Sequence, residues 1–405
     1  MSGALDGIRV LDLSRVLAGP WSTQILGDLG AEVIKVEQPG AGDDTRAWGP
    51  PFLAQSTDSA YFSCANRNKQ SIAVDIATPK GAEIIRRLAA TADVVVENFR
   101  VGGLARFGLD YDSLAAIKPD LVWCSITGFG QTGPDKDRGG YDFLIQGLSG
   151  LMSVTGAADG PPMKVGVPIS DLTTGLYAAI AILAALRHRD NTGQGQRIDL
   201  SLLEAQLAVM SNQAASWLNG GTEPGRLGNQ HPNIVPYQVF TCADGDILIA
   251  TANDRQWAKL VRVLGLDALA DAPPFATMSV RSANKHALLA AIEPVLAGWS
   301  SAELVEALNN AGVPSGRVNT VPEALAAPQV KARGLVRSIE RRDGSEVRFV
   351  GFPAQLSATP ASYRRAPPRA GEDTRAILRD VLHLSEAEIG RLFSTGTVAH
   401  GLADD

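Results

Sequence analysis

Asp171 is the carboxylate of this sequence that is best placed to do chemistry. It follows the extended segment 164–169 and precedes an apolar helical stretch with almost no polar side chain before Arg187. An acid at the start of a helix is usually a cap or a favourable first-turn charge. A carboxylate held there, which the helix N-terminus should keep ionised, can also act as a nucleophile. The residues alone favour the cap, so a catalytic role needs further support.

The segment Gly128-Phe-Gly-Gln-Thr-Gly133 has the glycine spacing of loops that bind dinucleotides. Such a loop needs a helix directly after the glycines, so that the helix N-terminus faces the pyrophosphate. Here Pro134 and the charged run 135–138 follow, and no acid ends a strand about 20 residues later. These features argue against a nicotinamide or flavin cofactor. They predict a connecting loop whose glycines would let the backbone approach a ligand.

Several arginines and rings lie in or near predicted loops and could serve a site. An arginine there is most often a solvated surface charge. The aromatic rings would usually pack locally, and a histidine in a turn would usually make a structural hydrogen bond. These residues are Arg15, Arg46, Arg106, Arg138, Trp48, Tyr141 and His231.

Composition narrows the classes of partner. The net charge is -6, and no Lys/Arg run is interleaved with aromatic residues, so nucleic acid is not expected to bind. The five histidines contain no pair at helical spacing and no Cys-x-x-Cys is present, so a metal site is not indicated. The three widely spaced cysteines predict small core residues in a reducing compartment.

No segment predicts a membrane anchor or a secretion signal. Residues 1–7 have no basic stretch followed by an apolar one, and the apolar stretch 176–186 is shorter than the ~18 residues of a span. We expect a cytoplasmic protein.

The elements that must position these residues follow an α/β pattern. Short apolar runs alternate with helical periodicity through the first 200 residues, which is typical of a mostly parallel sheet. Helices are indicated over 79–91, after the cap Thr78, and from Asp171 to about Arg189. The predicted strands are 8–13, 32–37, 93–98, 121–127 and 197–200.

The pattern changes near residue 222 and indicates a second, smaller unit. A hairpin over 237–251 precedes helical stretches at 255–264, 284–296 and 302–310, and a second hairpin turns at Asp343-Gly344. We therefore expect four parts: the N-terminal part of a large α/β domain at 1–200, a linker at 201–224, a small α+β domain at 225–325, and at 326–405 a return linker with the C-terminal part of the large domain.

A series of segments along the chain carries a resemblance to a known family. Two of them are Leu5-Asp-Gly-Ile-Arg-Val-Leu-Asp-Leu-Ser14 and Gly30-Ala-Glu-Val-Ile-Lys-Val-Glu37. The others are 18–20, 42–46, 96–99, 125–134, 170–171, 193–199 and 312–316. In these segments, which stand in the same order, the chain resembles the class III CoA-transferases, such as formyl-CoA transferase and carnitine CoA-transferase. The resemblance spans nearly the whole chain. It implies a Rossmann-like large domain built from both chain ends, and a homodimer of two interlocked rings.

The resemblance also gives Asp171 a role. The matching acid of the family attacks an acyl-CoA thioester, forms a mixed anhydride and then an aspartyl-CoA thioester, and passes coenzyme A to an acceptor carboxylate. Backbone N–H groups of the helix N-terminus or of a glycine loop would stabilise the oxyanions. The cap interpretation of Asp171 is therefore replaced by a nucleophile.

Contacts with coenzyme A, the shared part of both acyl-CoA substrates, follow position by position from the same resemblance. Formyl-CoA transferase has glutamine at the position of Leu17 and arginine at that of Gln38, so one phosphate contact must be replaced or lost. The tetraglycine loop of formyl-CoA transferase is absent from this chain, and we expect segment 228–231 to occupy the corresponding approach to the active site. The implied contacts are Val16, Leu17, Gln38, Val74, Asp75, Ile76, Ala77, Asn98, Phe99, Arg106, Arg138, Tyr141 and Asp142.

The acids that are exchanged are suggested by two segments, 42–52 and 228–237, which resemble the branch of the family that uses succinyl-CoA and glutarate. The substrate-contacting residues would be Arg46, Trp48, Tyr141 and His231. Arg46 would pair with the distal carboxylate of a dicarboxylate, and a structural ion pair with Asp43 or Asp44 is an equal alternative.

Two other functions stay open at this point. An α-methylacyl-CoA racemase shares the implied fold, but it carries Gly-His-Asp where this chain has Gly140-Tyr-Asp142. Tyr141 cannot supply an imidazole base near neutral pH. A CoA-binding protein without activity is the second alternative, and the presence of Asp171 within its motif argues against it.

Overall fold

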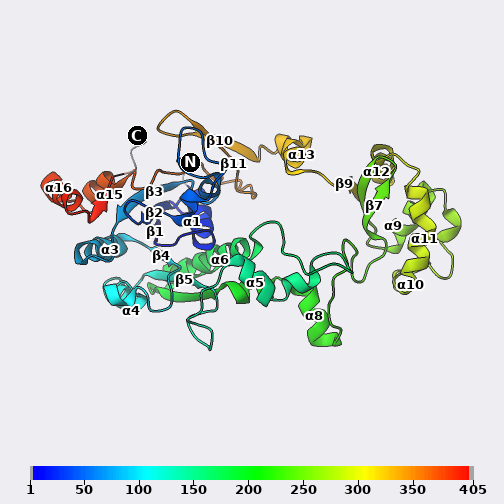
Figure 1. Cartoon of the computed structure of the whole chain (residues 1–405), viewed down its shortest axis with the longest axis horizontal. Coiled ribbons are helices and arrows are strands. Elements are labelled where there is room, and N and C mark those ends of the chain that lie inside the picture. The colour runs from blue at the N-terminus through cyan, green and yellow to red at the C-terminus, as the bar shows by residue number, and fades with distance from the viewer. Residues whose placement is uncertain (1–2, 401–405) are drawn as a thin grey trace. The chain divides into compact units, whose positions relative to one another are not determined.

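The computed structural model describes residues 3–400 and divides the chain into two compact units (Figure 1). The first unit contains the residues up to 151, residues 164–222 and the residues from 333 onward. The second unit contains residues 152–163 and 223–332. Most of the expected linker, 201–224, instead belongs to the first unit, where residues 202–208 and 211–220 are helical. Segment 152–163 joins the second unit, which nothing in the sequence pattern indicates.

A seven-stranded sheet forms the centre of the first unit, in the order β12-β3-β2-β1-β4-β5-β6. All neighbouring strands are parallel except β12, which pairs antiparallel with β3. The strand order reverses between β1 and β4, where open α/β sheets bind ligands outside the strand ends. The strands are β1 (Arg9–Asp12), β2 (Glu32–Glu37), β3 (Lys69–Val74), β4 (Val94–Glu97), β5 (Val122–Thr127), β6 (Gln196–Ser201) and β12 (Val398–Ala399).

The predicted, mostly parallel α/β sheet is confirmed, and each predicted strand is present as β1, β2, β4, β5 or β6. Strand β3 was missed. Two of the cysteines, Cys124 and Cys242, are buried as expected, but Cys64 is exposed, so it is not a core residue.

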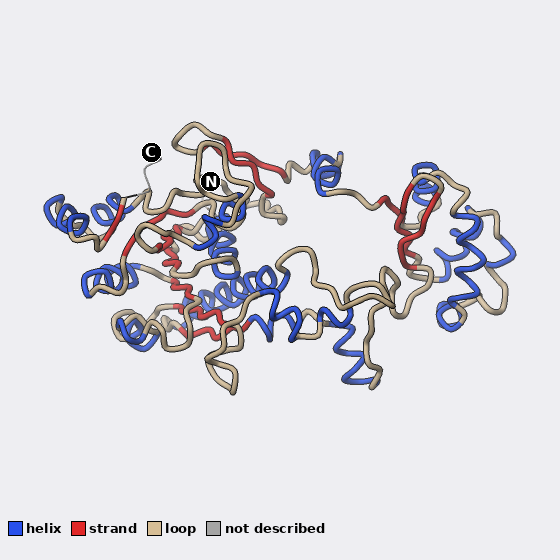
Figure 2. The backbone as a smooth tube through the Cα atoms, in the orientation of Figure 1, coloured by secondary structure: helices blue, strands red, loops and turns tan. Residues whose placement is uncertain are grey.

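Helices cover both faces of the sheet (Figure 2). Successive strand residues point to opposite faces. Leu11 and Ile34 therefore pack with α3, α15 and α16, whereas Val10 and Val33 pack with α1 and α6. The helices of this unit include α1 (Ala18–Asp28), α2 (Ala60–Ser63), α3 (Pro79–Thr91), α4 (Tyr111–Ala115), α5 (Asp142–Leu148), α6 (Ile169–Thr192), α7 (Leu202–Ala208), α8 (Ser211–Gly220), α15 (Thr374–Asp380) and α16 (Glu386–Ser394).

Helix α6 has the length and mean hydropathy, 1.7, of a membrane span, although 44% of that stretch is buried. Ala178 and Ile182 are buried in the core beneath the sheet, as is usual for a core helix of a soluble protein. Three other side chains of α6, Leu176, Tyr177 and Ile180, are exposed. The helix thus has one side in the core of this unit and one apolar side that this unit leaves uncovered.

The C-terminal part of the first unit contributes a hairpin. Three short 3-10 helices lie in the N-terminal half of the chain. The hairpin pairs β10 (Val336–Glu340) with β11 (Glu346–Val350), around the predicted turn at Asp343-Gly344. The 3-10 helices are η1 (Asp44–Ala47), η2 (Ala105–Phe107) and η3 (Leu151–Val154), the last of which crosses the boundary between the units.

The second unit has its own core around a three-stranded antiparallel sheet, β7-β8-β9. Trp257, Leu260 and Ile292 are fully buried against the sheet, so the predicted hairpin and helices carry a separate apolar centre. The elements are β7 (Tyr237–Cys242), β8 (Gly245–Ala250), α9 (Asp254–Val263), η4 (Asp267–Leu269), α10 (Met278–Ala283), α11 (Lys285–Leu296), α12 (Ser301–Asn310), β9 (Ser315–Arg317), α13 (Val321–Ala326) and α14 (Pro328–Ala332).

Candidate active site

Two neighbouring cavities open at the carboxyl ends of the central strands of the first unit. The Asp171 cavity, of about 190 Å³, is lined by the loops after β1, β4 and β5 and by Asp171. The β3 cavity, of about 260 Å³, is lined by the ends of β1, β2 and β3. Arg15 and Phe99 line both cavities, so the two form one cleft at the reversal point of the strand order.

The cleft brings together almost all the residues that were predicted to contact coenzyme A. Those lining the Asp171 cavity are Val16, Leu17, Asn98, Phe99, Arg138 and Tyr141. Those lining the β3 cavity are Gln38, Val74, Asp75, Ile76, Ala77, Phe99 and Arg106. Asp142 does not line either cavity and lies behind Asp171 instead.

The turn after β1 is shaped by an unusual backbone. Val16 has a φ of 70°, which a β-branched residue adopts only when its surroundings impose it. Its N–H donates to both carboxylate oxygens of Asp43 at 3.3 Å. Arg15 is tied to Asn98 by two hydrogen bonds of 3.0 and 2.7 Å, which join the loops after β1 and β4. Strain of this kind often marks a binding site.

The glycine loop closes the other side of the Asp171 cavity. A Cβ on Gly128 would lie 2.7 Å from the Cα of Gly140, so this close approach of two backbone segments requires glycine. Gly139 and Gly140 both line the cavity. The loop is therefore a ligand-facing wall and not a dinucleotide fingerprint.

Asp171 lies in the first turn of α6, but it does not cap the helix. Asp142 takes that role from α5, because its Oδ1 accepts from the N–H of Ser170 at 2.8 Å and of Asp171 at 3.4 Å. Gln146 holds the other oxygen of Asp142 at 2.7 Å. Leu172 donates its N–H to Pro168, so these first N–H groups of α6 are occupied. The glycine loop remains as the candidate for oxyanion contacts.

Burial and the nearby charge of Asp142 raise the pKa of Asp171 to about 7. The expectation that the helix N-terminus keeps this carboxylate ionised is therefore wrong near and below neutral pH. Desolvation and the like charge outweigh the helix dipole, whose first N–H groups are already paired with Asp142. A carboxylate with such a pKa is a stronger base than an ordinary aspartate.

Tyr61 was missed by sequence reasoning. Burial, followed by the charge of Asp171, raises the pKa of Tyr61 to about 12, so the phenol stays protonated near the carboxylate. Trp48 is 45% exposed, and its ring lies edge-on to the Tyr61 ring with centroids 5.2 Å apart. The short helix that carries Tyr61 has an ordinary cap, Ser59, and nothing in its sequence signals a site.

Arg46 forms buried structural ion pairs and does not line the cleft. The residue is 5% exposed, and its guanidinium pairs with Glu37 at 2.6 Å and with Asp58 at 2.7 Å. It also donates to the carbonyl of Pro368 at 3.0 Å and lies over the ring of Phe62. This geometry contradicts the predicted contact with a substrate carboxylate. The alternative, a structural ion pair, is confirmed, but its partners are Glu37 and Asp58 and not Asp43 or Asp44.

Tyr141 and His231 have different surroundings. Tyr141 is 68% exposed at the mouth of the Asp171 cavity. His231 belongs to the second unit, where its Nδ1 accepts from the N–H groups of Asn233 and Ile234. Its ring packs against Tyr237 with centroids 5.2 Å apart. The structure thus gives His231 local partners within its own unit.

Within residues 3–400, no group of three or more His, Cys, Asp or Glu side chains is arranged to hold a metal ion. The polar groups of the cleft that can reach a ligand are backbone amides, carboxylates and a few cations. The cations on the Asp171 cavity are Arg15, Arg100, Lys136 and Arg138. Such a wall suits a long ligand with phosphate groups.

The sequence of this chain was compared with those of known protein families and proteins. The model of CoA-transferase family III matches residues 5–374. The succinate–glutarate CoA-transferase of Agrobacterium fabrum is 48% identical over 93% of this chain and 95% of its own. The human succinyl-CoA:glutarate CoA-transferase is 44% identical over 97% of this chain and 90% of its own.

Solved structures agree with the sequence comparison. A CAIB/BAIF family protein of Brucella suis has a TM-score of 0.84 and 47% identity, over 94% of this chain and all of that one. A protein of Mycobacterium tuberculosis has a TM-score of 0.83 at 32% identity, over 92% of this chain and 99% of that one.

Proposed function

The chain belongs to CoA-transferase family III, and on this basis we propose that it transfers coenzyme A from succinyl-CoA or another dicarboxylyl-CoA to a carboxylic acid. The observation that carries the proposal is the position of Asp171 on the wall of the cavity that also contains Val16, Leu17 and Asn98. The named acids of the relatives support a dicarboxylate as donor.

Asp171 acts as the nucleophile in the proposed mechanism. Its ionised carboxylate attacks the thioester carbonyl, the C–S bond breaks, and coenzyme A leaves as a thiolate while a mixed anhydride forms. The thiolate then attacks the aspartyl carbonyl, which releases the donor acid and gives an aspartyl-CoA thioester. An acceptor carboxylate reverses the two steps and restores Asp171. No net proton is consumed, so no separate acid or base is required.

The cleft supplies the other requirements of this chemistry. The β3 cavity would receive one end of coenzyme A, and the loops after β1 and β4 would hold the chain that leads to Asp171. Gly139 and Gly140, on the same wall as Asp171, would direct N–H groups at the developing oxyanions. Arg15 lines both cavities, so it can supply the phosphate contact that Gln38, in place of an arginine, does not.

The acyl end of the substrate would lie near Trp48 and Tyr141, beside Asp171. Tyr61 is the added candidate, because its protonated phenol can donate to a substrate carboxylate. We keep His231 as a further candidate, with Arg46 removed from the set.

We also propose a cytoplasmic homodimer of interlocked rings. The exposed apolar side of α6, with Trp217 and Leu218 of α8, supports a partner, since such surface is seldom left in water. The interlocking itself rests on the family resemblance. Light scattering at decreasing concentration tests it, because interlocked rings cannot part without unfolding.

The two alternatives predict different products. An α-methylacyl-CoA racemase would exchange the α-proton for solvent deuterium without an acceptor acid. A binding protein would neither exchange this proton nor transfer coenzyme A. Tyr141, where the racemases carry histidine, disfavours the first.

The test is incubation with succinyl-CoA and a panel of carboxylic acids, with mass spectrometry of every new acyl-CoA. We expect glutaryl-CoA from glutarate, and little product from monocarboxylates. If coenzyme A moves to no acid of the panel, the proposal fails. Deuterium incorporation without an acceptor would favour the racemase.

A further inference from the structure

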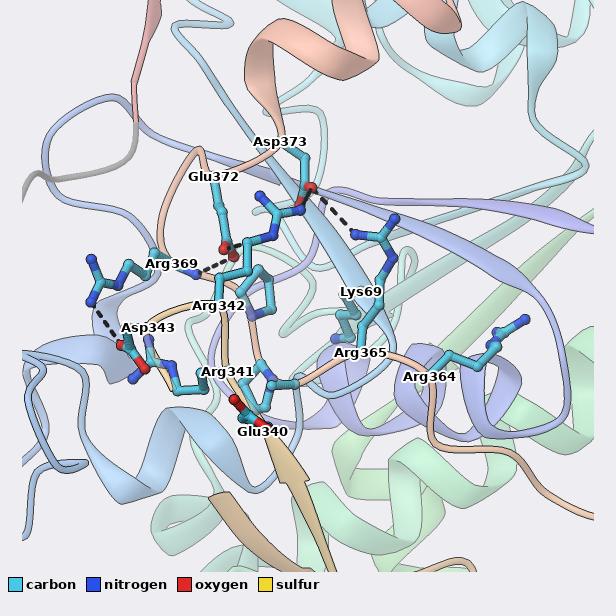
Figure 3. A pocket seen from close by; sticks show the side chains of 13 residues that line it. Lys69, Glu340, Arg341, Arg342, Asp343, Arg364, Arg365, Arg369, Glu372 and Asp373 are labelled. Carbon is cyan, nitrogen blue, oxygen red and sulfur yellow. Dashed lines mark hydrogen bonds and ion pairs between the residues drawn. The ribbon is translucent and has the colours of Figure 1, made fainter. Parts of the chain in front are cut away.

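A third cavity, of about 730 Å³, lies in the C-terminal part of the first unit, away from Asp171. It is formed by the end of strand β10 and the turn that follows it, by segment 364–369, and by the two acids before α15 (Figure 3). None of its lining residues lines the cleft described above. We call it the arginine cavity.

The lining of the arginine cavity carries more positive than negative charge. The cations are Lys69, Arg341, Arg342, Arg364, Arg365 and Arg369, and the acids are Glu340, Asp343, Glu372 and Asp373. Six cations against four acids leave two positive charges in excess. A cavity with this balance attracts anions.

Several of these cations are fully engaged and belong to the fold. The Lys69 Nζ donates to Asp12, Asn66 and the carbonyl of Pro20, which uses its three protons. Arg364 donates to three backbone carbonyls of segment 27–31, and Figure 3 shows it pointing away from the others. Arg369 pairs with Asp343 at 2.8 Å. These residues do not need a ligand.

Arg341 differs, because it is 5% exposed and its Nη1 has no hydrogen-bond partner. Its Nη2 donates to Asp58 at 3.1 Å, and the same carboxylate pairs with Arg46 at 2.7 Å. One carboxylate therefore serves two buried guanidinium groups. The Nη1 is itself enclosed by protein, so an acceptor in the cavity reaches this guanidinium only after the Arg341 side chain turns toward the opening. Buried donors of a charged group are nearly always paired, so an unpaired Nη1 favours such a turn when an acceptor is present.

Two further arginines stand at the edge of the same cavity. Arg342 and Arg365 both approach Asp373, at 2.7 and 3.4 Å, and both are substantially exposed (Figure 3). The longer contact leaves Arg365 weakly held, so it can turn to an incoming oxyanion at little cost. Arg341 would then form the floor of a site and Arg365 its rim.

We propose that the arginine cavity binds a small polyanion, a polyphosphate or a polycarboxylate, between Arg341 and Arg365. Both classes present the several oxygen atoms that guanidinium groups recognise. The site is separate from the cleft of Asp171, so the inference does not depend on the proposed function.

The experiment is calorimetric titration of the full-length protein with inorganic pyrophosphate and, separately, with citrate. Saturating coenzyme A is present throughout to block the cleft. Arg365→Met should raise the dissociation constant by about tenfold or more, as expected for a lost charge-assisted contact. The matched control is Arg348→Met, an exposed arginine on β11 that does not line the cavity.

The outcomes separate the possibilities. Binding of one probe that weakens in Arg365→Met and not in Arg348→Met supports the site and identifies its class. Arg341→Lys keeps a positive charge beside Asp58 but loses the two terminal NH2 groups of the guanidinium, and it should weaken binding in the same way. Equal losses in Arg365→Met and Arg348→Met would show general surface attraction and overturn the proposal. Absence of binding to the native protein also overturns it, as would be found if a second copy of the chain fills the cavity.

Discussion

Two aspartates of the same cleft have opposite surroundings. Asp43, on the β3 cavity, pairs with the Lys35 ammonium at 2.8 Å and accepts from the N–H of Thr45. Burial opposes its ionisation, but these partners lower the pKa of Asp43 to about 2. Asp171, on the Asp171 cavity, faces Asp142 instead, and its pKa is raised to about 7. The same side chain is thus held ionised in one region and has a pKa near neutrality in the other.

The two aspartates differ in whether a cation lies beside them. The buried ions around Asp43 form neighbouring pairs, such as Lys69 with Asp12 and Arg46 with Glu37, so each charge has a counter-charge. Removing one member of such a pair leaves an uncompensated buried charge. Asp171 has no cation among the causes that shift its pKa. A missing counter-charge therefore distinguishes the proposed nucleophile from the structural carboxylates better than burial does.

The largest effect is expected from Asp171→Ala. Exchange of coenzyme A should fall by about 10⁴-fold or more, because the nucleophile is lost while the cleft remains. Binding of coenzyme A, measured by calorimetry, should be unchanged. Wild-type protein treated with acyl-CoA and hydroxylamine should give a hydroxamate at Asp171. An adduct on another residue would move the nucleophile elsewhere.

A stability effect is expected from Arg46→Met. It should cost about 3 to 5 kcal/mol of unfolding free energy, because Glu37 and Asp58 lose a buried partner. Arg15→Met, at a pair whose arginine side chain is 58% exposed, should cost about 1 kcal/mol or less. Denaturant titration of both variants measures the contrast.

The activity of Arg46→Met shows whether Arg46 supports the fold or contacts the substrate. At a temperature where Arg46→Met is folded, kcat/KM should fall equally with succinyl-CoA and butyryl-CoA as donors. A selective loss with succinyl-CoA would instead return Arg46 to the substrate site.

The pH profile tests the like-charge pair. With a pKa near 7, Asp171 is ionised above neutral pH, so kcat/KM should rise with pH and level off above 7. At pH 6 about a tenth of the plateau should remain. Asp142→Asn keeps an oxygen for the Ser170 N–H but removes the negative charge, so the pKa of Asp171 falls and the rise moves to lower pH. An unchanged profile would mean that Asp142 does not set this pKa.

The smallest effect is expected for Arg15→Met in substrate binding. An exposed contact with a phosphate is worth about 1 kcal/mol, so KM for acyl-CoA should rise about fivefold with kcat nearly unchanged. Arg379→Met, at an exposed pair with Asp380 outside both cavities, is the control.

Most of the sheet could be predicted because its strands are short apolar runs. Strand β3 could not, since its buried Lys69 and Ser71 look like surface residues until their partners are known. Lys69 is held by Asp12 and Ser71 by Glu37, which come from other strands. A single sequence does not show such long-range pairing.

The site shows the same limit. The residues around Asp171 were placed by resemblance, and from the residues alone Asp171 would have been a cap. The actual cap, Asp142, comes from another helix, so its effect on the pKa of Asp171 depends on tertiary structure. Arg46 was misplaced for a similar reason, because its partner carbonyl on Pro368 is 322 positions away.

The joining of both chain ends in one sheet has a consequence for synthesis on the ribosome. Ile72 and Ile85 belong to a core that is completed by Ile377, Leu378 and Ile389. At about 5 to 20 residues per second, the roughly 200 residues between the end of β6 and that last helix take about 10 to 40 s to translate. Throughout that interval one side of the sheet of the nascent chain has the cover of α3 but lacks that of α15 and α16, so part of its apolar surface stays exposed to solvent. We therefore expect chaperones that hold apolar surface to bind the nascent chain on this side, and to leave only after the C-terminus emerges.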